Sequence, residues 1–116
     1  MKNPKTSRFS ILFLVAIVSL QSCIIKDAKP KDCVVKEVTI ARISEGSSYD
    51  IRLYDGNTDY YYINRGLETG LTMEGLSKDI LNKKVTLHLY KFKFGIESEH
   101  VSQLAVEDKI IFTEFK

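Results

Sequence analysis

Residues 49–63 of this 116-residue chain, YDIRLYDGNTDYYYI, contain its clearest structural pattern. Tyr49, Ile51 and Leu53 alternate with polar or outward neighbours, which is the period-2 pattern of a strand with one buried face. Gly and Asn in residues 55–59 supply the positive φ that a hairpin turn needs, and residues 60–63 form the returning strand. The stretch therefore predicts a β-hairpin.

Strand patterns continue on both sides of this hairpin. Before it, residues 34–43 are rich in β-branched side chains and end at a turn signal in residues 44–47. After it, apolar and polar residues alternate again over residues 85–90, 101–106 and 110–115. The chain is therefore expected to be mainly β.

A single helix is expected among these strands, over residues 73–81. Apolar side chains recur there at spacings of three and four residues, which places them on one helix face. Thr72 is the expected N-cap, and Asn82 is the expected left-handed residue at the C-terminal end.

Three strands, a helix and then the remaining strands is the order of an OB-fold, a five-stranded, partly open Greek-key barrel. We therefore expect a small OB-like barrel of five or six strands, with one short helix between strands 3 and 4. The last hairpin would add or extend a strand. A small α+β sheet with the helix packed on one face is the alternative.

Two segments also resemble known proteins. Residues 61–68 (Tyr-Tyr-Ile-Asn-Arg-Gly-Leu-Glu), followed by the short helix and residues 83–87 (Lys-Lys-Val-Thr-Leu), are similar to small OB-like bacterial proteins, many of them exported. The resemblance covers residues 34–116 and implies a fold rather than an activity.

The first 22 residues have the layout of an export signal. Lys2, Lys5 and Arg8 precede a 12-residue apolar stretch, residues 9–20. A helix of that length covers roughly 18 Å, which is well short of the ~30 Å hydrocarbon core of a bilayer. Residues 1–22 are therefore expected to be a signal peptide rather than a membrane-spanning anchor.

Leu20-Gln21-Ser22-Cys23 resembles a lipobox, the site at which bacterial lipoprotein precursors are diacylated on Cys and cut just before it. Ser22 is small at the cleavage point, and Cys23 offers the thiol for lipidation. Two or three acyl chains, palmitate among them, make a stable anchor where one holds only reversibly. The resemblance implies a lipoprotein of the cell envelope; an ordinary signal peptide with a chance cysteine is the alternative.

Residues 23–33 are expected to be the lipidated N-terminus and a tether, and residues 34–116 the OB-like domain. Ile24 and Ile25 follow the lipobox without an Asp, which favours the outer membrane over the inner membrane. From Cys23 onward there are 14 Lys and Arg and 15 Asp and Glu. Nucleic-acid-binding proteins usually carry a clear basic excess, so no nucleic-acid partner is expected.

The hairpin supplies the candidate ligand site, because strands 2 and 3 form the usual ligand platform of OB-folds. If Tyr54 lies opposite Tyr60, then Arg52, Tyr54, Tyr60 and Tyr62 share one outward face. Phenol rings with a guanidinium would bind sugar rings, bases or a peptide. A register shifted by one residue would instead turn Tyr60 and Tyr62 toward the core beside Leu53.

Arg65 follows this strand in the turn Asn64-Arg65-Gly66. It is the candidate anchor for an anion or carboxylate beside the aromatic side chains. A purely structural turn is the alternative, since Asn and Gly favour turns. Further along, Lys91-Phe92-Lys93-Phe94 is typical of an exposed loop that touches lipid or a partner, or of a solvated hairpin tip.

Catalytic chemistry has little support in the sequence. Cys33 is either a free thiol, if Cys23 carries lipid, or a small apolar side chain that opens a strand. An enzyme would use Cys33 with His88 or His100. The common nucleophile, phosphate-loop, dinucleotide and zinc-protease motifs are absent from the sequence, and no cofactor or metal is expected.

The expected function is therefore binding: a membrane-anchored, exported module for an envelope saccharide, peptide or protein. A small envelope enzyme that uses Cys33 is the alternative.

Overall fold

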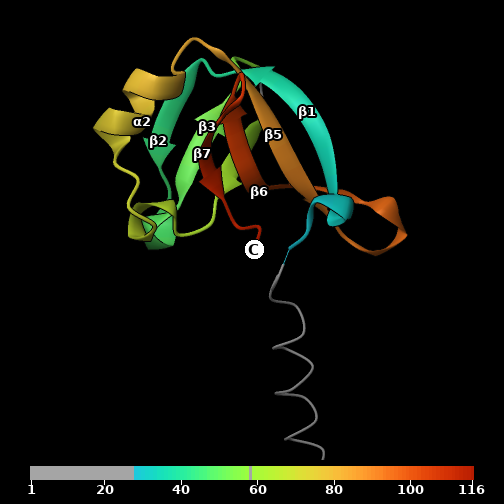
Figure 1. Cartoon of the computed structure of the whole chain (residues 1–116). Coiled ribbons are helices and arrows are strands. Elements are labelled where there is room, and N and C mark those ends of the chain that lie inside the picture. The colour runs from blue at the N-terminus through green and yellow to red at the C-terminus, as the bar shows by residue number, and fades with distance from the viewer. Residues whose placement is uncertain (1–27, 58) are drawn as a thin grey trace, which may run out of the picture.

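The computed structural model describes residues 28–57 and 59–116 (Figure 1). The signal peptide and the lipobox with Cys23 lie outside the described residues, as do Ile24 and Ile25. Within the described part of the chain, no helix is long and apolar enough to cross a membrane.

The described chain is mainly β, as expected. Its strands and its one α-helix are β1 (Cys33–Thr39), β2 (Arg42–Glu45), β3 (Ile51–Tyr54), β4 (Tyr60–Ile63), α2 (Met73–Ile80), β5 (Lys84–Lys91), β6 (Glu97–Val106) and β7 (Lys109–Thr113). Short 3-10 helices are η1 (Pro30–Asp32), η2 (Ser47–Tyr49), η3 (Gly66–Glu68) and η4 (Lys93–Gly95).

The predicted helix is confirmed together with both of its ends. The Thr72 hydroxyl accepts a hydrogen bond of 3.0 Å from the Gly75 amide, which caps an otherwise unpaired donor of the first turn. Asn82 has a φ of 62°, the left-handed conformation expected of it. Leu76 and Ile80 are buried, and α2 lies at one end of the sheet (Figure 1).

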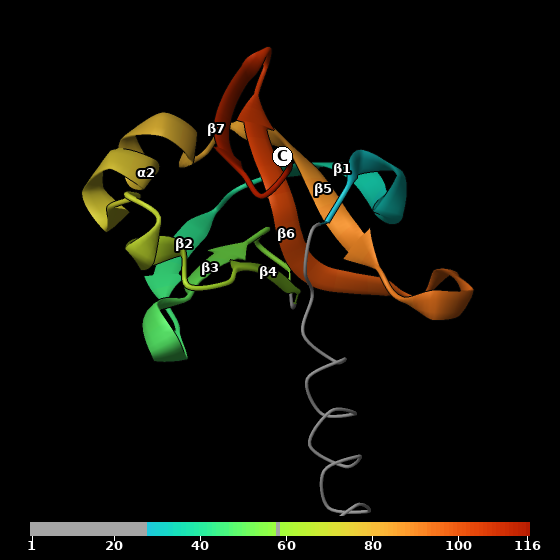
Figure 2. The same cartoon turned by 60° about the horizontal axis from the view of Figure 1, so that its bottom comes forward.

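The strands form one curved sheet in the order β1-β5-β6-β4-β3-β2, with β7 paired to β6 (Figure 2). Every pairing is antiparallel except β4 with β6, which is parallel and places Tyr62 opposite His100. This pairing joins the hairpin of residues 51–63 to the C-terminal strands.

The mainly β character with one helix is as expected, whereas the expected count of five or six strands is wrong. Residues 34–43 do not form one strand, because β1 ends at Thr39 and β2 begins at Arg42, and the sheet has seven strands. The sheet is also not a closed barrel, since β1 and β2 stand at the two ends of its strand order.

Hydrogen bonds at the break explain why the first predicted strand divides. The Ile40 amide donates to the Lys83 carbonyl oxygen at 3.1 Å, whereas the next amide, that of Ala41, donates to the Tyr54 carbonyl oxygen at 2.8 Å. Two successive residues therefore bond to different parts of the chain. The backbone leaves β5 at this point and continues along β3.

The core lies on the inner face of the sheet. Its buried side chains are Val38, Ile40, Ile51, Leu53, Tyr61, Ile63, Leu76, Ile80, Val85, Leu87, Leu89, Val101, Leu104 and Phe112. Full burial of one such aliphatic side chain contributes roughly 1.5–3 kcal/mol. Because successive strand residues point to opposite faces, the intervening residues of β2, β3 and β4 lie on the outer face.

Candidate functional site

The pairing of β3 with β4 has the register on which the predicted ligand face depends. Tyr54 lies opposite Tyr60, and Arg52 lies opposite Tyr62. Leu53 lies opposite Tyr61, and both of these side chains are buried in the core. The hairpin register is confirmed, and the four predicted side chains share the outer face.

The turn that joins these strands has the chemistry expected of it. Gly56 has a φ of 89°, in the left-handed region that a residue with a Cβ adopts at a cost. The Asp55 carboxylate accepts a hydrogen bond of 2.9 Å from the Asn57 amide, which closes the chain back on itself.

Two arginines lie over the tyrosine rings of this face. The Arg52 guanidinium carbon is 5.3 Å from the centroid of the Tyr60 ring, and that of Arg42 is 3.8 Å from the centroid of the Tyr54 ring. The rings of Tyr54 and Tyr60 are themselves 5.7 Å apart. We call Arg42, Arg52, Tyr54, Tyr60 and Tyr62 the aromatic–arginine face.

Arg42 is a member of this face that the sequence patterns did not identify. It reaches the face because β2 pairs with β3 and places Arg42 opposite Tyr54. The alternation of Arg42 with the partly buried Ile43 is a weak local signal of an outward side chain. That signal does not say which strand lies alongside, and so it does not predict the stacking.

Tyr54 is held in a polar environment. The Ser44 hydroxyl donates a hydrogen bond of 3.4 Å to the Tyr54 phenol oxygen. This bond is the main reason that the pKa of Tyr54 is lowered from its ordinary value, and a hydrogen bond from the Arg52 guanidinium is the second reason. Tyr62 differs, because burial raises its pKa, with the negative charge of Asp50 as the next cause.

A histidine–carboxylate pair supports the inner edge of the aromatic–arginine face. Tyr62 packs edge-on against the buried His100 ring, with 5.5 Å between ring centroids. The Nε2 atom of His100 lies 2.9 and 3.0 Å from the two carboxylate oxygens of Glu114. Glu114 is brought there by its own amide, which donates to the Ser102 carbonyl oxygen at 2.8 Å.

Arg65 does not act as a free cation beside this face. Its Nε and Nη2 atoms donate to the two carboxylate oxygens of Glu68 at 2.6 and 2.7 Å. The pair is solvent-exposed and raises the pKa of Arg65 while it lowers that of Glu68. Arg65 has a φ of 50°, and its amide donates to the Asp50 carboxylate at 2.8 Å. Its guanidinium carbon lies 5.8 Å from the centroid of the Tyr49 ring, outside the aromatic–arginine face.

Cys33 is the first residue of β1 and is half-buried, in agreement with its interpretation as a small side chain that opens a strand. Its thiol donates a hydrogen bond of 3.6 Å to the Lys29 carbonyl oxygen. Burial raises the pKa of the thiol above its ordinary value, with a smaller opposing effect from the Ser102 hydroxyl. A thiol held in the protonated form is a poor nucleophile.

The two histidines are engaged elsewhere. His100 is bound by Glu114, and the ring of His88 packs edge-on against Phe115 with 5.6 Å between centroids. His88 is half-buried. These contacts give the combination of Cys33 with a histidine base no support.

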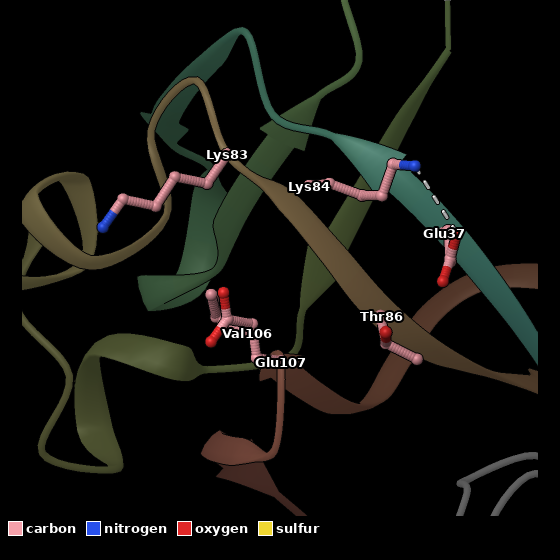
Figure 3. Close-up of a pocket in the computed structure, with 6 residues that line it drawn as sticks. All are labelled: Glu37, Lys83, Lys84, Thr86, Val106 and Glu107. Atoms are coloured by element: carbon pink, nitrogen blue, oxygen red, sulfur yellow. Dashed lines mark ion pairs between the residues drawn. The ribbon is translucent and has the colours of Figure 1, made fainter.

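A pocket of about 430 Å³, drawn in Figure 3, is lined by no residue of the aromatic–arginine face. Its lining residues are Glu37, Lys83, Lys84, Thr86, Val106 and Glu107. Lys84 lies 3.8 Å from the Glu37 carboxylate, and the Lys83 side chain extends away from this pair. Two lysines balance two glutamates here, so the pocket has no charge preference for a ligand.

No protein-family model matches the chain, and comparisons with curated proteins and with solved structures found no match. Function is therefore inferred from the geometry of the aromatic–arginine face.

Proposed function

We propose that this protein is an exported lipoprotein, anchored to the membrane through Cys23, that binds an envelope saccharide or peptide bearing an acidic group on its aromatic–arginine face. The observation that carries the binding proposal is the pair of arginine–tyrosine stacks, Arg42 on Tyr54 and Arg52 on Tyr60, on the outer side of the sheet.

The charge of these arginines favours an acidic ligand. Within the described residues, neither Arg42 nor Arg52 forms an ion pair, whereas Arg65 is neutralised by Glu68. A guanidinium stacked on a ring still presents its N–H donors at its edge, where a carboxylate or phosphate accepts two of them.

The tyrosines supply the second part of the recognition. Tyr60 is 39% exposed, and its ring lies beside that of Tyr54. Aromatic rings on an open sheet face offer a flat apolar surface with a hydroxyl at the edge, which suits a sugar ring or a peptide side chain. The proposed ligand therefore carries an acidic group for the arginines and a sugar ring or peptide side chain for the tyrosines.

An OB-like arrangement is part of the same proposal. β1 and β2 can be counted as one strand that bends at Ile40 and Ala41. Its first part pairs with β5, the strand that follows α2, and its second part pairs with β3. β3 and β4 then take the places of strands 2 and 3, which carry the ligand in OB-folds. This correspondence supports the assignment of the outer hairpin face as the binding surface.

Titration of the full chain with soluble peptidoglycan fragments and lipopolysaccharide core oligosaccharides tests the proposed binding. The Tyr54→Ala/Tyr60→Ala double variant should lose binding while its circular dichroism spectrum stays unchanged. Tyr49→Ala is the matched control, because Tyr49 is an exposed tyrosine outside the face. Equal affinity of the double variant and the wild type would contradict the proposal.

A further inference from the structure

The tip of the β5–β6 hairpin exposes an unusual concentration of apolar surface. Phe92, Phe94 and Ile96 are 45%, 99% and 60% exposed. The loop is closed by a hydrogen bond of 2.8 Å from the Phe92 amide to the Ile96 carbonyl oxygen. Single exposed apolar residues are normal, whereas a cluster at a projecting tip marks an interaction surface.

The backbone holds this tip in a defined shape. Phe94 has a φ of 67° and Gly95 has a φ of 73°, so two successive residues adopt the left-handed region. A bulky residue with positive φ is uncommon. The turn directs Phe94 outward rather than back onto the sheet, as its 99% exposure shows.

Lysines surround the apolar tip. Lys93 lies in the tip and Lys91 ends β5 beside it. Together with Lys31 of η1 they line a depression of about 330 Å³, whose other lining residues are Asp32, Tyr90, Phe92 and Gly95. Lys29 precedes η1 directly. Two acids lie close by: Asp32, which accepts from the Lys29 amide at 3.3 Å, and Glu97, which pairs with Lys91 in the sheet register. Positive charge is in excess.

The tip also lies at the end of the domain where the described chain begins. Figures 1 and 2 both show the tip projecting beyond the sheet on the same side as η1. Residues 30–32, expected to be part of a solvated tether, form η1 and contact β5. Cys23 precedes Ala28 by five residues, a length of chain that spans at most about 18 Å.

We propose that residues 92–96, with the nearby Lys29, Lys31 and Lys91, form a second contact with the membrane. Their partner is an anionic bilayer surface, and the two phenylalanines insert into its headgroup layer. The proposal rests on the lipid anchor of the proposed function, since acylated Cys23 would hold this end of the domain within reach of the headgroups. Phenylalanine side chains bury at the boundary between headgroups and acyl chains, and lysines are attracted to anionic lipids. An acyl anchor plus a basic patch would orient the domain, with this end toward the lipid.

Tryptophan fluorescence tests the contact directly, because the chain has no native Trp. Phe94→Trp in the full chain provides a single reporter at the tip, and the 99% exposure of Phe94 makes the change harmless to the core. Tyr49→Trp, at a 58% exposed position in η2, is the matched control. Both variants are mixed with phosphatidylethanolamine–phosphatidylglycerol vesicles or with phosphatidylcholine vesicles, each carrying brominated acyl chains.

We expect the emission of the Phe94→Trp variant to move to shorter wavelength and to be quenched in the anionic vesicles, with a much smaller effect in phosphatidylcholine. Added salt should reduce the effect, since the charge interaction is screened within about 10 Å at 0.1 M. The emission of the Tyr49→Trp control should not respond. Lys91→Gln with Lys93→Gln should weaken the partitioning of the tip by roughly 30-fold, or about fivefold for each lysine.

Sedimentation with the vesicles separates this inference from the anchor. If the Phe94→Trp variant pellets through its lipid while its tip reporter stays unquenched, the membrane contact is overturned and the anchor stands. Quenching of the tip reporter in a chain without acyl mass on Cys23 would support the contact and refute the anchor. An emission shift of this variant that depends on protein concentration, without vesicles, would assign the tip to self-association and overturn the proposal.

Discussion

Replacing Tyr60 and Tyr61 separately by Ala should have different consequences, although the two residues are neighbours of the same type. Tyr61 is 4% exposed and belongs to the core, whereas Tyr60 is 39% exposed and lies on the aromatic–arginine face. The register of the hairpin alone produces this difference, since Tyr61 pairs with Leu53 and Tyr60 pairs with Tyr54.

The structure sets the size of each effect. Removing the buried Tyr61 ring leaves a cavity, and aromatic-to-Ala changes in a core lower the free energy of unfolding by ~3–5 kcal/mol. Tyr60 loses only its exposed stacking on Arg52 and Tyr54, which is worth about 1 kcal/mol. In a domain of this size, 1 kcal/mol corresponds to a change in Tm of roughly 4–8 °C.

Thermal and urea denaturation of the full chain, followed by circular dichroism, measure both variants. We expect Tyr61→Ala to lower Tm by roughly 12 °C or more, and Tyr60→Ala by less than about 8 °C. Ligand binding should fall with Tyr60→Ala at a temperature where the variant is fully folded. A larger loss of stability for Tyr60→Ala than for Tyr61→Ala would refute the assignment of inner and outer faces.

Two further predictions concern the cysteines. Cys23 should be the N-terminus of the exported protein and carry acyl mass, and Cys23→Ser should leave an uncut precursor without that mass. Mass spectrometry of the membrane fraction measures both. An N-terminal peptide that begins at Cys23 without lipid, or that still contains Leu20, would contradict the prediction. Burial raises the pKa of Cys33, so its protonated form stabilises the fold at pH values below the unfolded thiol pKa, and this contribution is lost as pH rises through the higher folded value. Alkylation of Cys33 by iodoacetamide, read from the peptide that contains it, should therefore need a higher pH in the folded chain than in urea; identical pH profiles would show that the thiol is not desolvated.

Several features of the fold were predictable because they depend on neighbours in the sequence. The helix over Met73–Ile80, with Thr72 and Asn82 at its ends, follows from spacing and capping within a few residues. The β3–β4 hairpin follows in the same way from period-2 alternation around a Gly-containing turn. Arg52, Tyr54, Tyr60 and Tyr62 share one face under one of the two registers left open by the sequence, and the structure has that register.

Other features depend on which distant strands meet. The division of residues 34–43 into β1 and β2 is not marked by any turn signal in the sequence, because the break at Ile40 and Ala41 is set by hydrogen bonds to Lys83 and Tyr54. The same holds for Arg42, which joins the aromatic–arginine face only through the pairing of β2 with β3.

Local periodicity was enough to predict the mainly β character and the single helix, whereas it left open which of two hairpin registers forms. The folded sheet was needed to establish the hairpin register, the pairing of His100 with Glu114 and of Arg65 with Glu68, and the fact that the sheet is not a closed barrel. These features depend on strand order, because that order minimises the free energy of the whole sheet. Residues far apart in the chain become neighbours through that order, and alternation within one strand carries no information about them.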